Sequence, residues 1–375
     1  MKKIQMVDLQ TQYTKIKEEI DAGIAEVINS ASFIKGPKVA EFQAHLEQYT
    51  GAKHVINVGN GTDALQIALM GLGLQPGDEV ITPTFTFIAT AEVVALLGLT
   101  PVVVDVDWET MNMDIESVRR AITPHTKAIV PVHLFGQCAN MEAIMELANE
   151  HHLYVIEDAC QAIGAQYTFS NGETKQAGTI GHIGCTSFFP SKNLGCYGDG
   201  GAIFTNDDAL ADKMQAIANH GCHIRYHHDE VGVNSRLDSI QAAVLDAKLP
   251  HLNEYIAARQ KAAAYYDKAF ADNEKLLIPG HEPHSTHVFH QYTLRVVGAD
   301  RDALREGLAA RGIPAMIYYP VPLHQQKAYL DPRYKDGDFP AAERLAACVL
   351  SLPMHTELDE EQLQFITSSV LDLIR

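Results

Sequence analysis

Lys192 lies between an aromatic, strand-like run and a series of glycines. Phe188 and Phe189 precede it, and the glycines that follow are Gly195, Gly198, Gly200 and Gly201. A lysine among apolar side chains is poorly hydrated, which lowers its pKa and makes the free amine a usable nucleophile. Glycines let the backbone approach a bound group closely. The alternative is a solvated surface lysine, which is what most lysines are.

A second candidate is the segment Asn60-Gly61-Thr62, between an expected strand at 54–58 and an expected helix at 62–72. The first N–H groups of a helix have no partner within the helix and carry partial positive charge, so this junction can hold a phosphate. The alternative is an ordinary turn with Thr62 or Asp63 near the N-cap. Neither GxxxxGK[ST] nor GxGxxG occurs, so the sequence predicts no P-loop and no dinucleotide motif.

A third candidate is the pair Glu157-Asp158, at the end of an expected buried strand at 153–157. An acid there is costly unless it faces a cation or a hydrogen-bond donor, and a protonated heterocyclic nitrogen is such a partner. The alternative is an N-cap for the following segment. A phosphate cup, a carboxylate for a ring nitrogen and a Schiff-base lysine are together what pyridoxal phosphate (PLP) needs. Phe85 and Phe87 offer an aromatic face for its ring.

The elements that position these residues alternate between strands and helices from residue 50 to about 250. Such alternation predicts a mostly parallel sheet between helices, with ligands beyond the carboxyl ends of the strands. All three candidates lie at such ends. From about residue 251 the regular alternation gives way to a long Ala-rich helix followed by an α+β pattern. This change predicts a large domain over 1–250 and a smaller α+β domain over 251–375. The expected strands are 54–58, 80–83, 101–106, 127–132, 153–157, 186–189, 202–205 and 290–297, and the expected helices are 14–28, 62–72, 89–97, 115–121, 141–151, 253–271, 301–311 and 360–373.

Composition excludes several classes of function. The formal net charge of −18 argues against a nucleic-acid-binding surface. We see no apolar leader at the N-terminus, and the longest apolar stretch, 93–104, is too short to span a bilayer, so we expect a cytoplasmic protein. The six cysteines are scattered and read as reduced thiols. Segment 219–228 is rich in His and Cys but lacks catalytic zinc spacing, so we expect no metal.

Several longer motifs together resemble those of the DegT/StrS family of nucleotide-sugar aminotransferases. They span almost the whole chain: SFIKGPKVAEFQ, NGTDAL, PGDEVITPTFTFIAT, IEDACQAIGA, TSFFPSKNLGCYGDGGA, GVNSRLDSIQAA and YYPVPLH. The resemblance implies a PLP-dependent transferase of fold type I, working as a homodimer with shared active sites. It implies that glutamate donates an amino group, leaving as 2-oxoglutarate, and that a UDP-linked keto-sugar accepts it.

The resemblance also implies a role for each matched position. Lys192 would hold the cofactor and move the proton, and Asp158 would pair with the pyridine nitrogen. The remaining cofactor contacts would be Gln161 at the ring hydroxyl, Phe87 stacked on the ring, Ser187 with the Gly61 and Thr62 amides at the phosphate, and Asn234 from the partner subunit. Arg236 would meet the substrate, again from the partner, with Lys35, Tyr318 and Tyr319 as further substrate contacts.

The implied substrate is narrower still. Dehydratases of this fold have histidine at the lysine position, so Lys192 argues against that branch. The motifs look most like those of enzymes that aminate C3 of UDP-2-acetamido-2-deoxy-3-oxo-glucuronate, in amino-sugar biosynthesis for cell-surface polysaccharides such as lipopolysaccharide O-antigen. Those enzymes commonly have His-Tyr-Pro where this chain has Tyr318-Tyr319-Pro320. A 3-keto or 4-keto deoxyhexose nucleotide, or a regulator without turnover, are the alternatives.

Overall fold

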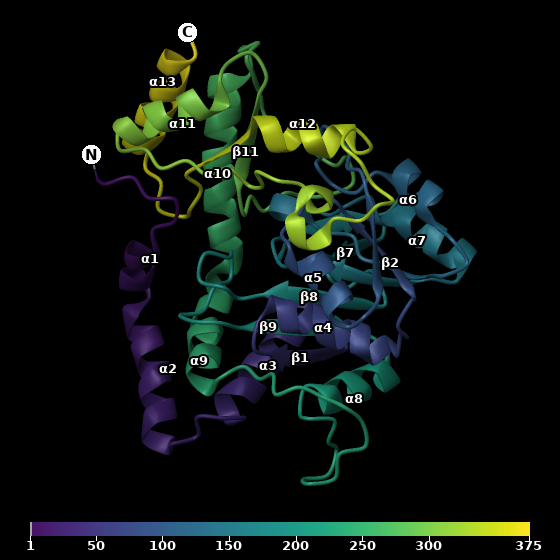
Figure 1. Ribbon diagram of the computed structural model, residues 1–375. Coiled ribbons are helices and arrows are strands. Elements are labelled where there is room, and N and C mark those ends of the chain that lie inside the picture. The colour runs from purple at the N-terminus through teal and green to yellow at the C-terminus, as the bar shows by residue number, and fades with distance from the viewer. Residues whose placement is uncertain (1) are drawn as a thin grey trace.

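The core of the protein is a seven-stranded sheet, seen in a computed structural model that describes residues 2–375 (Figure 1). Four neighbouring strand pairs are parallel, whereas β9 runs antiparallel to both of its neighbours. The sheet is therefore mixed but mostly parallel, as expected. In spatial order its strands are β1 His54–Val58, β9 Gly201–Thr205, β8 Ile183–Ser187, β5 Tyr154–Asp158, β4 Thr126–Ile129, β2 Glu79–Pro83 and β3 Thr100–Val104.

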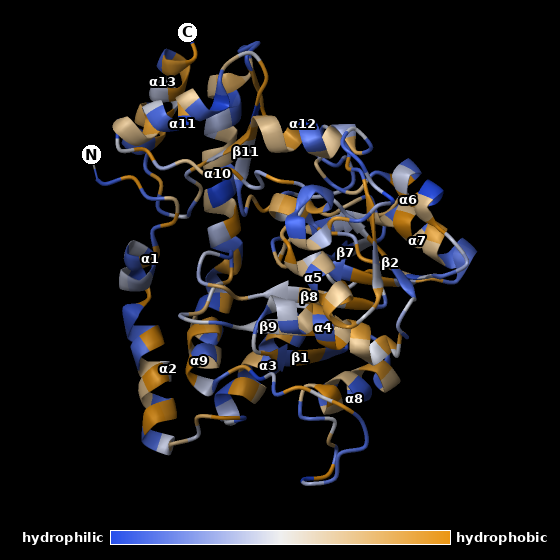
Figure 2. Ribbon diagram, in the orientation of Figure 1, coloured by the Kyte–Doolittle hydropathy of each residue, from blue (hydrophilic) through white to orange (hydrophobic). Residues whose placement is uncertain are grey.

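Helices cover both faces of this sheet. Successive strand residues point to opposite faces and are apolar on both, so each face needs a layer of helices to bury it. Val155 packs in one apolar cluster with α3, α6, α7 and α9, and Ile156 packs in another with α4, α5 and α8. Along the helices that cover the sheet, orange apolar residues alternate with blue polar ones (Figure 2). These helices are α3 Pro37–Thr50, α4 Gly61–Leu72, α5 Ala89–Leu96, α6 Ile115–Ala121, α7 Met141–His151, α8 Asp208–Ile217 and α9 Ser239–Lys248.

The N-terminal segment differs from the single helix expected at 14–28. Two helices, α1 Leu9–Lys15 and α2 Lys17–Ser30, meet at Ile16, whose φ of −121° and ψ of 25° are not helical. Ile16 is buried with Ile20 and Val244 in a small cluster, so the break lets its side chain pack inward. The expected helices also did not include α3, α8 and α9, or the helix at Pro340–Cys348.

A second sheet lies in the C-terminal part of the chain. Its three antiparallel strands are β10 Leu276–Leu277, β11 Tyr292–Val296 and β12 Val349–Leu352, and its helices are α10 Leu252–Phe270, α11 Arg301–Ala310, α12 Pro340–Cys348 and α13 Glu360–Leu373. Its core includes Tyr266 and Tyr292, together with Ile4 from the chain start. Another apolar cluster contains Phe85 and Leu323, which belong to different predicted domains. The division into 1–250 and 251–375 remains our proposal. A short hairpin, β6 Gln166–Thr168 with β7 Thr174–Gln176, completes the strands.

Candidate active site

A cavity of about 620 Å³ opens where β1, β2, β5 and β8 end. These four strands run in the same direction, so their carboxyl ends meet at one edge of the sheet. The cavity brings together nine of the predicted site residues: Gly61, Thr62, Phe87, Asp158, Gln161, Ser187, Lys192, Tyr318 and Tyr319. His290 and Gln291, which the sequence did not single out, also line it.

The start of α4 can hold a phosphate. Its N-cap is Asn60, whose side chain accepts from the Asp63 N–H at 2.8 Å, so Thr62 and Asp63 follow the cap in the first turn of the helix. Among the described residues, no acceptor is bound to the N–H groups of Gly61 and Thr62. A Cβ at Gly61 would lie 2.8 Å from the Cβ of Ser187, so only glycine lets α4 approach that hydroxyl so closely.

The carboxylate of Asp158 is the last side chain of β5 and is nearly buried, with 6% exposure. Its Oδ2 accepts a hydrogen bond from Thr90 Oγ1 at 2.8 Å, and its Oδ1 accepts one from the Cys160 N–H at 3.2 Å. Thr90, in the first turn of α5, is 1% exposed and was not identified from the sequence. Two donors thus fix the carboxylate, which retains lone pairs for a further donor from the cavity.

Lys192 lies in the loop after β8, and backbone hydrogen bonds within this loop hold its conformation. The Lys192 N–H donates to the Phe189 carbonyl at 2.8 Å, and the Cys196 N–H donates to the Phe188 carbonyl at 2.8 Å. Burial lowers the pKa of Lys192 from its ordinary value, while the negative charge of Asp158 acts in the opposite direction. The amine is therefore more easily deprotonated than that of a surface lysine, which is what a nucleophile requires.

Gln161, Phe87 and the two tyrosines also line the cavity. The Phe135 N–H donates to Gln161 Oε1 at 2.7 Å, and Gln161 Nε2 donates to Tyr319 Oη at 3.1 Å. These partners orient the amide so that its second N–H is available to a ligand. Phe87 is 53% exposed, which leaves its ring free to cover a planar group. Burial raises the pKa of both Tyr318 and Tyr319, so both stay protonated.

Three predicted residues lie outside this cavity. Asn234 is exposed and pairs through its backbone with Asn219. Arg236 and Lys35 line a different hollow of about 220 Å³, where Lys35 Nζ donates to Asn219 Oδ1 at 2.7 Å. Lys192 is the only lysine or arginine among the described residues that line the main cavity, against the acids Asp63, Asp158 and Asp199.

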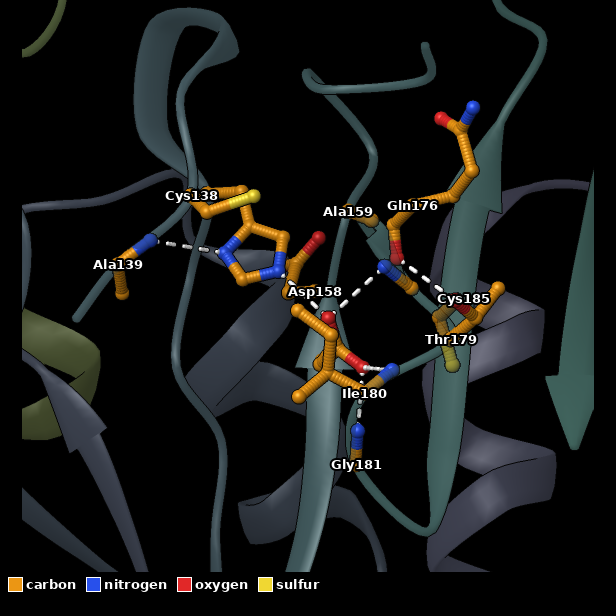
Figure 3. Close-up of polar contacts among 12 residues, drawn as sticks. Cys138, Ala139, Asp158, Ala159, Gln176, Thr179, Ile180, Gly181 and Cys185 are labelled. Atoms are coloured by element: carbon orange, nitrogen blue, oxygen red, sulfur yellow. Dashed lines mark hydrogen bonds and ion pairs between the residues drawn. The ribbon is translucent and has the colours of Figure 1, made fainter. Parts of the chain in front are cut away.

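Directly beside Asp158, the carboxylate of Glu157 is fully buried and faces the other side of the sheet. It accepts hydrogen bonds from the N–H groups of Gly178, Ile180 and Gly181 at 2.6–2.8 Å, and from His133 Nε2 at 2.8 Å. The Ala139 N–H donates to His133 Nδ1, which places the ring proton on Nε2. Figure 3 shows Ala139 on one side of this cluster and Ile180 and Gly181 on the other. Glu157 therefore anchors the end of β5.

Two further features bear on the sequence predictions. Within residues 2–375, no group of three or more His, Cys, Asp or Glu side chains is arranged to hold a metal ion. Over the same residues, every helix is either too short or too polar to cross a bilayer. The cytoplasmic location stays a prediction.

Comparison with known proteins identifies the family. The sequence profile of the DegT/DnrJ/EryC1/StrS aminotransferase family matches residues 14–371. A UDP-2-acetamido-2-deoxy-3-oxo-D-glucuronate aminotransferase of Pseudomonas aeruginosa is 48% identical over 98% of this chain and 99% of its own length. A UDP-N-acetyl-3-dehydro-alpha-D-glucosamine 3-aminotransferase of Acidithiobacillus ferrooxidans is 47% identical, covering 98% of this chain and 97% of that protein.

Two more matches span the chain. A protein of Geobacillus stearothermophilus named pleiotropic regulatory protein is 47% identical and covers 99% of both chains. The structure of S. venezuelae DesV in complex with a ketimine intermediate superposes with a TM-score of 0.94 at 40% identity, covering 99% of this chain and 98% of that one. The fold class expected from the sequence is confirmed. The chain belongs to the DegT/DnrJ/EryC1/StrS aminotransferase family.

Proposed function

We propose that this protein is a PLP-dependent aminotransferase that moves an amino group from glutamate to C3 of a UDP-linked 2-acetamido-2-deoxy-3-oxo-glucuronate. One observation carries the proposal: a partly buried lysine, a carboxylate at a strand end and the free amides of a helix start share a single cavity. Family membership and the relatives' substrates support it. A regulator without turnover would not need a lysine that shares one cavity with a carboxylate and free helix amides.

The donor set of the cavity fits pyridoxal phosphate. The Gly61 and Thr62 amides and the Ser187 hydroxyl suit a phosphate, and Asp158 suits a protonated ring nitrogen. Gln161 has one N–H to offer the ring hydroxyl, and Phe87 has an open face for the ring. When bound, the cofactor supplies an electron sink that stabilises negative charge at the donor Cα.

The residues of the chain then supply proton transfer and orientation. Lys192 is the amine that would hold the cofactor, and as a free amine it would take the proton from the donor Cα as a base and return it as an acid. Asp158, fixed by Thr90 and Cys160, keeps the ring nitrogen protonated. Phe87 and Tyr319, with ring centroids 6.1 Å apart, are both available to contact the ring of the cofactor.

A second copy of the chain would complete the site. A nucleoside diphosphate needs cations, and Lys192 alone does not offset the three acids of the cavity. Asn234, Arg236 and Lys35 lie outside it, so in our proposal they serve the cavity of a partner subunit. The segment just before Asn234 also exposes apolar side chains, with Ile224 at 68%, Tyr226 at 78% and Val231 at 85%. Such a patch is typical of a protein interface.

The first test uses visible absorbance of the protein loaded with PLP. Glutamate should bleach the absorbance of the cofactor attached to Lys192, and a keto-sugar nucleotide should restore it. Lys192→Ala should abolish both changes, whereas Lys127→Ala, at an exposed position on β4, should leave them intact. A full turnover cycle by Lys192→Ala would refute the role of that lysine.

The second test concerns the sugar. Amination of the UDP-linked 3-keto uronate should exceed that of the corresponding 3-keto sugar without a carboxylate, and of 4-keto deoxy sugars. Arg236→Gln should remove most of the preference for the uronate, because the guanidinium fork binds carboxylates through paired hydrogen bonds. Equal or better activity on a 4-keto deoxy sugar would overturn the uronate assignment.

The third test concerns the shared site. Asn234→Ala should weaken PLP binding, and mixing it with Lys192→Ala should recover part of the activity in hybrid dimers. Each hybrid would contain one site with both wild-type residues. A monomer by light scattering, or no recovery on mixing, would contradict the shared-site proposal.

A further inference from the structure

Lys248 is a buried lysine that the proposed chemistry does not use. It ends α9 with 1% exposure, and its Nζ donates to the Gly195 carbonyl at 2.7 Å. The same Nζ lies 4.5 Å from the ring centroid of Tyr197. Among residues 2–375, no carboxylate forms an ion pair with Lys248. Burying an unpaired ammonium costs free energy, so packing alone does not account for a lysine at this position.

The acceptor of Lys248 belongs to the loop that carries Lys192. Gly195 is packed so tightly that a Cβ there would lie 2.3 Å from the Pro190 carbonyl oxygen, so its peptide has little freedom to move. A second side chain of α9 holds the same loop, because Gln241 Oε1 accepts from the Tyr197 N–H at 2.8 Å. Residues 241 and 248 lie two helical turns apart and therefore on one face of α9. This face fastens the loop immediately after Lys192.

We propose that Lys248 is a positioning residue for Lys192: its ammonium holds the loop at Gly195 and so determines where the Lys192 amine stands in the cavity. The proposal rests on the function proposed above. A charged donor suits this task, because hydrogen bonds from ammonium groups to carbonyls are shorter and stronger than neutral ones. The aromatic face of Tyr197 stabilises the charge further.

The charge of Lys248 is conditional on pH. Burial lowers the pKa of Lys248 to about 8. The titratable groups that face it are Cys196 and Tyr197, where burial raises the pKa to about 11 and about 12 respectively, so both are neutral at pH 7. Lys248 should thus be mostly charged at pH 7 and mostly neutral above pH 9.

The experiment compares Lys248→Met with Lys268→Met, an exposed lysine in the last turn of α10. The first measurement is amide hydrogen exchange over 188–200 in the protein without added cofactor. We expect exchange at 193–197 to rise by about tenfold in Lys248→Met, the size expected for loss of one charge-assisted hydrogen bond, and to stay unchanged in Lys268→Met. Unchanged exchange in Lys248→Met would overturn the proposal.

The second measurement is the rate at which added PLP attaches to Lys192, trapped by borohydride and located by mass spectrometry. Attachment should slow by about tenfold in Lys248→Met. The affinity for pyridoxamine phosphate, which cannot attach, should not change. Lys248→Arg should restore part of the rate and keep it above pH 8, where the wild type loses the charge of Lys248. A wild type that binds no PLP would refute the proposed function, whereas hydrogen exchange tests the loop contact independently.

Discussion

The hydrogen bond from Thr90 to Asp158 gives the sharpest prediction about the proposed cofactor site. Thr90→Val replaces the hydroxyl by a methyl group of similar shape and removes one of the two donors that hold the carboxylate. A hydrogen bond to a charged group contributes about 1.5–3 kcal/mol, so we expect the free energy of unfolding to fall by about 2 kcal/mol without cofactor. Urea unfolding followed by circular dichroism, at one fixed protein concentration, measures this change.

Two comparisons make the result specific. Thr82 on β2 is also fully buried, but its hydroxyl has no partner among the described residues, so Thr82→Val should cost nothing or stabilise the fold. Thr90→Ser keeps the donor and should retain most of the stability. The cost of Thr90→Val should vanish in an Asp158→Leu background, where the acceptor is gone. If Thr90→Val costs no more than Thr82→Val, or costs the same in both backgrounds, the hydrogen bond does not hold the carboxylate.

Three further predictions concern two positions at the candidate site and one buried histidine outside its lining. Glu157→Gln turns an acceptor into an amide N–H facing backbone donors, so unfolding free energy should fall by about 3 kcal/mol or more in urea titrations; a loss below about 1 kcal/mol would argue against the anchor. Gly61→Ala places a methyl group against Ser187 and should weaken PLP binding by about tenfold in absorbance titrations, so an unchanged affinity would argue against this phosphate site. Burial lowers the pKa of His355 to about 4, so the folded state binds fewer protons than the unfolded state. This contribution to stability is complete above pH 6.5 and is lost at about 1.4 kcal/mol per unit as pH falls toward 4, a slope that His355→Gln should reduce.

The sequence was sufficient to predict that the main candidate residues lie close together, because they occupy strand ends. Asp158 closes a short apolar run, and Lys192 follows another, so strand–helix alternation alone directs both to one edge of the sheet. Gly61 and Thr62 are found for the same reason, since they begin the helix after β1. Local pattern and tertiary position agree at these residues.

The residues that hold the site could not be predicted in this way. Thr90 lies 68 positions from Asp158, and Lys248 lies 53 positions from Gly195. Nothing in the local sequence distinguishes Thr90 from any threonine at a helix start, or Lys248 from any lysine in a last helical turn. The roles that we assign them come from partners that only the folded chain brings within reach.

The alternation of side chains along β5 explains why the adjacent acids Glu157 and Asp158 have different roles. Successive side chains of a strand point to opposite faces, so Glu157 and Asp158 cannot share an environment. Glu157 is closed in by four donors and has no access to the cavity, and it fixes the backbone at the point where β5 ends. The His133 N–H reinforces this point by donating to the Asp158 carbonyl at 3.0 Å. Asp158 takes only two donors, so its carboxylate is held in direction but is still able to bind a third. Glu157, whose oxygens are fully hydrogen-bonded, thus fixes the strand end that carries Asp158, whose carboxylate can still accept a hydrogen bond. This is the arrangement that the proposed cofactor nitrogen at this strand end requires.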